Sequence, residues 1–117
     1  MLEYILPQET PVREAPGFAA KEFPFKEGSE ELNFAEITLD ARYPVSGWAV
    51  NAISVMSVYI VEGTVTLVTS ETSITLTAGS MIRIPADQEY HWVPSPKVKM
   101  LVISNPPWTL DQHRNIA

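Results

Sequence analysis

Two neighbouring residues with ring side chains, Tyr90 and His91, are the best suited in this chain to acid–base chemistry. They lie in the run EYHWV, directly before Trp92. An imidazole titrates near neutral pH, so His91 could act as a general acid or base or hydrogen-bond a ligand; the alternative is a histidine satisfied by backbone groups. Because neighbouring residues on a strand point to opposite faces, only one of the two rings can face an interior site.

Sequence motifs of other chemistries are missing. The chain has no Cys, which excludes disulfides, thiolate metal sites and cysteine nucleophiles. It also has no G-x-S-x-G, P-loop or H-E-x-x-H motif. We interpret His113, in the run LDQHRN near the C-terminus, as a surface residue.

Arg83 is a charged residue in the otherwise apolar run MIRI. A charge in a core strand is costly unless it is paired or exposed. We expect a carboxylate partner on the outer face, and anion binding is the alternative role.

The segments that must position these residues are short and β-rich, with turn signals between them. Val, Ile, Thr and aromatic residues dominate each run, and TVTLVT and SITLTA alternate with period two. The runs are 34–39, 52–61, 64–69, 73–78, 80–84, 89–93 and 97–104. In a chain of 117 residues this pattern predicts one all-β domain, a sandwich or a barrel.

The first 31 residues differ from the rest. They hold four prolines among scattered apolar residues, which forbids a long helix and favours extended or edge-strand structure. We predict an N-terminal arm over 1–31 and a barrel over 32–117. The arm would pack on the barrel or on a neighbouring subunit, with Glu27, Glu30 and Glu31 facing water; a frayed terminus is the alternative.

The net charge of −6 comes from 14 acids and 8 bases, and it is concentrated in the first 40 residues. Without a basic patch, nucleic acid and anionic membranes are not expected as partners. The N-terminus has no signal-peptide pattern, and no window approaches the roughly 18 apolar residues of a membrane span. We therefore expect a cytoplasmic protein.

The stretch 57–92 resembles the cupin family. The segment VYIVEGTVTLV is similar to the end of the family's first motif, and Gly79 to Pro85 reproduces the G-x5-P spacing of the second, G-x5-P-x-G-x2-H. The resemblance implies an all-β, RmlC-like jelly-roll barrel in a single domain. It extends to the small β-barrel at the end of phosphomannose isomerases.

The resemblance does not carry over the family's metal site. Counting back from Gly63, the two histidines and the carboxylate of the first motif fall on Ala49, Asn51 and Met56. If three residues instead of four separate the second histidine from the carboxylate, the histidine positions are Val50 and Ala52. Neither set can form the two-imidazole, one-carboxylate site of catalytic cupins, so we predict no metal and no cofactor.

In the second motif the glycine position is Asp87 and the histidine position is Tyr90. One extra residue in the 87–89 turn would bring His91 into the histidine position. We expect this, and therefore predict that His91 faces the barrel interior in a neutral form, with Tyr90 outside and Trp92 on the outer face or on the arm.

The same alignment predicts which side chains line the interior. If Met56 faces inward, period-two alternation brings Ser54, Val58 and Ile60 inward, and leaves Ser57, Tyr59 and Val61 outside. The interior could be an apolar ligand pocket or a filled core. Asn51 and Trp48 could offer a ligand an amide and a stacking face.

Two functions follow from these expectations. The first is a small-molecule-binding cupin without the metal site, whose ligand the sequence does not name. The second is a metal-independent isomerase, epimerase or lyase acting on a sugar or a small organic acid, with Tyr90, His91 and Tyr59 as acid–base candidates. An interaction module using the acidic arm is a weaker third. The apolar residues of the arm also predict a homodimer.

Overall fold

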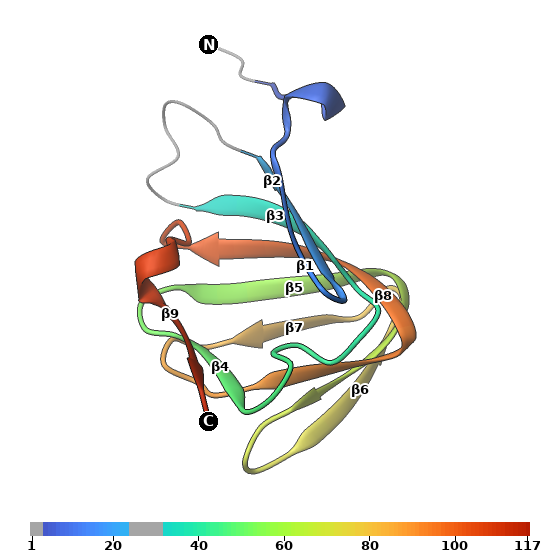
Figure 1. Ribbon diagram of the computed structural model, residues 1–117, viewed down its shortest axis with the longest axis vertical. Coiled ribbons are helices and arrows are strands. Elements are labelled where there is room, and N and C mark those ends of the chain that lie inside the picture. Colours follow the sequence, from blue (N-terminus) through green and yellow to red (C-terminus); the bar gives the residue numbers. More distant parts are fainter. Residues whose placement is uncertain (1–3, 24–31) are drawn as a thin grey trace.

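A computed structural model describes residues 4–23 and 32–117 of the chain. In these residues the chain is almost entirely β (Figure 1). The strands are β1 (Val12–Ala15), β2 (Phe18–Phe23), β3 (Asn33–Leu39), β4 (Trp48–Asn51), β5 (Val55–Val68), β6 (Ser73–Thr77), β7 (Met81–Ile84), β8 (His91–Asn105) and β9 (His113–Ile116). Two 3-10 turns, η1 (Pro7–Glu9) and η2 (Leu110–Gln112), are the only helical segments described, and neither could cross a bilayer.

Seven strands form one antiparallel sheet in the order β1-β2-β3-β8-β5-β6, with β7 also paired to β5. The second sheet, β4 with β9, lies at one end of these strands (Figure 1). Two isolated bridges, Ala49 to Tyr90 and Tyr43 to Trp92, connect the second sheet and its approach to the first. The all-β, cupin-type barrel expected from the sequence is confirmed, although its two sheets do not close into one continuous ladder.

The long strands β5 and β8 curve the large sheet. Their pairing shifts register between Ile60 and Glu62 and again between Gly63 and Val65, as at a β-bulge. Gly63 has φ 85°, and a Cβ there would lie 2.1 Å from the carbonyl oxygen of Lys97. Only glycine fits this bend, which explains the glycine of the Glu-Gly turn.

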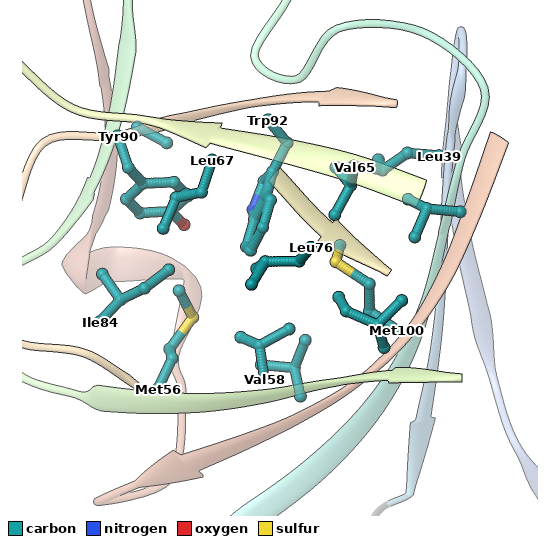
Figure 2. Packing of buried hydrophobic residues seen from close by; sticks show 14 residues of the cluster. Leu39, Met56, Val58, Val65, Leu67, Leu76, Ile84, Tyr90, Trp92 and Met100 are labelled. Carbon is teal, nitrogen blue, oxygen red and sulfur yellow. The ribbon is translucent and has the colours of Figure 1, made fainter. Parts of the chain in front are cut away.

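The alternation predicted for β5 is confirmed. Met56, Val58 and Ile60 are buried, whereas Tyr59 and Val61 are 38% and 41% exposed. In Figure 2, Met56 and Val58 point into the interior from one side, and Tyr90 and Trp92 point toward them from the other. The interior is thus built from facing strands, as the period-two pattern requires.

The expected N-terminal arm contains a β-hairpin. Strand β2 pairs with β3 along its whole length, and β1 adds an exposed edge strand beyond it. These strands extend the sheet of their own chain and bring residues of the N-terminal segment to the interior. Residues 24–31, including Glu27, Glu30 and Glu31, lie outside the described part of the chain.

Candidate functional site

A partly open cavity of about 70 Å³ lies between the inner face of the large sheet and the β4–β9 pair. Its walls are largely apolar and aromatic, with a small number of polar groups, as is usual for small-molecule sites. The aromatic lining residues are Phe18, Phe34, Tyr43, Tyr90, Trp92 and Trp108. The polar ones are Arg13, Glu22, Asn33, Asn51, Ser104 and His113.

Asn51, buried at the end of β4, is the centre of the polar network. Its side-chain oxygen accepts hydrogen bonds from Trp108 Nε1 at 2.9 Å and from His113 Nδ1 at 2.7 Å. Its Nδ2 donates to Met56 Sδ at 3.3 Å and lies 3.5 Å from the hydroxyl of Tyr90. Because an indole N–H can only donate, the contact with Trp108 fixes which end of the amide is the oxygen.

This orientation determines the proton on His113. An amide oxygen only accepts, so Nδ1 of His113 must carry a hydrogen. In the neutral ring Nε2 is then the acceptor, and the hydroxyl of Tyr43, 2.8 Å away, donates to it. Tyr43 and His113 thus form a hydrogen-bonded phenol–imidazole pair whose imidazole is held by Asn51.

Burial keeps this pair and the second phenol uncharged. Desolvation raises the pKa of Tyr43, although the positive charge of Arg13 acts in the opposite direction. Desolvation also raises the pKa of Tyr90, which is 3% exposed, and outweighs its hydrogen bond to Asn51. For His113, desolvation and then Arg13 lower the pKa, and the side chain of Asn115 acts in the opposite direction. Near pH 7 the site therefore presents neutral phenols and a neutral imidazole.

Backbone pairing explains how these side chains meet. In the β4–β9 ladder Asn51 lies directly opposite His113. The N–H of Tyr43 donates to the carbonyl of Trp92 at 3.0 Å, and that of Ala49 donates to the carbonyl of Tyr90 at 2.8 Å.

The buried side chain of Gln112 anchors the start of β9. Its Oε1 accepts from the N–H groups of Ile53 and Ser54 at 3.0 and 2.7 Å, and its Nε2 donates to Ser54 Oγ. This fixes the C-terminal segment to the β4–β5 loop and positions His113 next to it.

Three of the residues predicted to bind a ligand come together here. Asn51, Met56 and Tyr90 all line the cavity, and Asn51 contacts the other two. The other three lie outside the lining. Trp48 packs against His91 with ring centroids 4.9 Å apart, and exposed Arg83 has no carboxylate within ion-pair distance among the described residues.

The prediction that His91 faces the interior is wrong, and so is the outward placement of Tyr90 and Trp92. Tyr90 and Trp92 are buried and line the cavity, whereas His91 is half-buried beside Trp48. Asp87, where the resemblance has glycine, has φ 66°, a conformation that suits glycine. Tyr90, where the resemblance has histidine, faces the interior without the inferred extra residue.

The interpretation of His113 as a surface residue is also wrong, and Tyr43, Trp108 and Arg13 were not predicted at all. His113 stands in a polar C-terminal run, and its role depends on pairing with a strand 62 residues away. No local sequence pattern indicates such a pairing. Tyr59, the remaining acid–base candidate, lies on the outer face of β5.

Three positions were assigned to the family's metal ligands by the sequence resemblance. There, Ala49 has no donor, Met56 offers a thioether, and the oxygen of Asn51 already accepts two hydrogen bonds. His113 is the imidazole in the lining. Among residues 4–23 and 32–117, no three His, Cys, Asp or Glu side chains gather as metal ligands would.

No protein-family model and no curated protein sequence matches the chain. Solved structures do match. A histidine-to-glutamine variant of Streptomyces Pac13 with uridine has a TM-score of 0.84 at 13% identity, covering 100% of this chain and 92% of the other. Pac13 is described as a nucleoside dehydratase.

An RmlC-like cupin from Shewanella frigidimarina has a TM-score of 0.74 at 18% identity, covering 95% and 96% of the two chains. Ectoine synthase from P. lautus has a TM-score of 0.69 at 13% identity, covering 91% and 80%. At these identities the likeness establishes the fold. The chain therefore has the RmlC-like cupin fold.

Proposed function

We propose that this chain binds a small organic molecule in the cavity around Asn51, without using a metal ion. The observation that supports the proposal is the hydrogen-bond network around Asn51, a position that the resemblance assigns to a metal ligand. Asn51, Tyr90 and His113 bring an amide, a phenol and an imidazole to the place where the resemblance implies a metal. The hydroxyls of Tyr43 and Tyr90, which this network positions, keep hydrogen-bonding capacity and can orient a polar ligand. The aromatic walls can hold its apolar part.

A metal-independent lyase, isomerase or epimerase is the second candidate, and the Tyr43–His113 pair favours it. A neutral imidazole can accept a proton and a neutral phenol can donate one, which are the two steps of acid–base catalysis at carbon or oxygen. One structure with the same fold is described as a nucleoside dehydratase, and removal of water is a lyase reaction. Variants of that enzyme with a histidine or a tyrosine replaced were solved with uridine.

A thermal-shift screen tests the binding proposal. Purified protein is screened against sugars, nucleosides, sugar nucleotides and organic acids, and a ligand at a hundredfold excess over its Kd should stabilise it by about 2.7 kcal/mol. Ser104→Leu, which fills the cavity from β8, should abolish this shift. Ser57→Leu, the same change on the outer face of β5, is the matched control. A ligand that stabilises both variants equally would show that the cavity is not its site.

The catalytic candidate needs a separate measurement. Each ligand from the screen is incubated with the protein and followed by NMR for loss of water, hydrogen exchange at carbon or a change of stereochemistry. Tyr43→Phe and His113→Gln should slow any such reaction by about 10²-fold or more while ligand binding persists. Turnover that both variants retain would assign the chemistry to other residues.

A further inference from the structure

We infer that the ligand of this cavity carries an oxyanion, a carboxylate or a phosphate, which Arg13 binds. The inference rests on the proposed function and selects one class among its ligands. Arg13 stands on the edge strand β1, and it is the one Lys or Arg among the described residues that line the cavity.

Arg13 lies across two aromatic pairs that border the cavity. Its guanidinium carbon is 4.6 Å from the ring centre of Trp108 and 5.9 Å from that of Phe18. Phe18 in turn stacks on Tyr43 with centroids 4.8 Å apart, and Trp108 packs on His113 at 5.7 Å. The cation is therefore held by the same rings that border the Tyr43–His113 pair, since cations are attracted to aromatic faces.

Within the part of the chain that the structure describes, the outer nitrogens of this guanidinium have no hydrogen-bond partner. Its ion pair is with Glu22 and joins Nε to Oε1 at 3.7 Å, and neither Nη donates a hydrogen bond to a described residue. Arg42 differs, because its two Nη atoms donate to the carbonyls of Pro44 and Gly47. A guanidinium with both Nη groups free can bind a carboxylate or a phosphate through two parallel hydrogen bonds.

An anion on Arg13 would also affect the acid–base pair. The charge of Arg13 contributes to the lowered pKa of His113 and opposes the rise in that of Tyr43. Neutralising this charge should raise the pKa of both groups. Binding of an oxyanion would thereby make the imidazole a stronger base when the ligand is present.

Matched pairs of small compounds test the inference by NMR. The anions are 4-hydroxybenzoate and phenyl phosphate, and the neutral partners are 4-hydroxybenzyl alcohol and phenol. They are titrated into the wild type, Arg13→Gln and Arg114→Gln, while the Arg13 Nε–H, Trp108 Nε1–H and His113 ring signals are followed. Arg114, an exposed residue of β9, is the control for loss of a positive charge.

The expected result is that at least one anion binds about tenfold more tightly than its neutral partner, shifts the Arg13 signal and raises the pKa of His113. Arg13→Gln should remove this preference, and Arg114→Gln should keep it. The anion that binds more tightly identifies the group as carboxylate or phosphate. Equal binding of both partners in wild type and Arg13→Gln would overturn the inference and leave the cavity proposal standing. If no compound shifts a cavity signal, both fail.

Discussion

Asn51 decides the character of the site at the scale of single residues. One amide oxygen holds both an indole and an imidazole, and its nitrogen contacts Met56 and Tyr90. Since its acceptor and donor capacity is used within the protein, Asn51 fixes the orientation of the groups around it. It thereby leaves the neutral Tyr43–His113 pair as the acid–base candidate of the cavity.

The lowered pKa of His113 predicts a pH-dependent stability. In the unfolded chain the ring titrates near its ordinary value of about 6.5, and in the folded protein burial and Arg13 place its pKa below that. Below about pH 6.5 the unfolded state binds more protons than the folded state. The free energy of unfolding that His113 contributes above this pH is therefore lost as the pH falls through the folded pKa.

Thermal unfolding between about pH 7.5 and pH 5.5 measures this effect. His113→Gln should reduce the fall in Tm over this interval. His91, whose pKa is also lowered by burial and by Arg42, contributes its own part, which His91→Gln measures separately. An unchanged fall in His113→Gln would contradict the buried, neutral ring.

The residues of the site were predictable only where local patterns govern them. Alternation along β5 and the family spacing correctly brought Asn51 and Met56 to the interior. The prediction that His91 faces the interior was wrong because it assumed one extra residue in the 87–89 turn. A shift of one residue reverses the face of every side chain in the strand that follows. His113 was missed because β9 meets β4 through a contact between distant segments.

At the scale of elements, the turn before β8 sets the site. Asp87 adopts φ 66°, a conformation that glycine tolerates best, and its N–H donates to the carbonyl of Asn51 at 2.7 Å. The turn therefore controls which face Tyr90 presents. It also ties the start of β8 to the end of β4.

Substitutions at Asp87 test this role. Asp87→Val should lower the free energy of unfolding by about 1–2 kcal/mol, because a β-branched residue is strained at positive φ. Asp87→Gly should be neutral or stabilising, since glycine adopts this conformation without strain. Urea titration of the two variants measures the difference. Equal stability of both would show that the turn does not require positive φ.

The anchor of β9 gives a second prediction at this scale. Gln112→Leu leaves the N–H groups of Ile53 and Ser54 without their acceptor and should cost about 1–3 kcal/mol of stability. It should also weaken ligand binding, because His113 follows directly. Gln88→Leu, at a residue whose side chain bonds only its neighbour's exposed carbonyl, should stay within about 0.5 kcal/mol of wild type. Similar losses in both would mean that Gln112 does not anchor β9.

At the scale of the whole molecule, the fold class was the most predictable feature. Alternating runs, turn signals and the two glycine positions correctly predicted one all-β cupin domain. The hairpin β1–β2 was less accessible to prediction, because prolines indicate extended structure without naming its partner strand. That hairpin supplies Arg13 and Phe18 to the cavity, so the N-terminal segment is part of the site.

The exposed edge of the sheet supports the prediction of a homodimer. All four residues of β1 are exposed, and β1 pairs with β2 along one side. Pairing with a second copy would cover this edge. Light scattering at micromolar concentration should give twice the 13.0 kDa of the chain, and Val12→Asp should shift the protein toward the monomer. A monomeric mass for the wild type would contradict the prediction.

We propose above that the cavity works with hydrogen-bonding groups in place of a metal. Elemental analysis of the purified protein, combined with ligand titration before and after chelator treatment, tests it most directly. We expect no stoichiometric transition metal and the same Kd in both titrations. One equivalent of iron, manganese, zinc or nickel, removed by the chelator together with ligand binding, would contradict it.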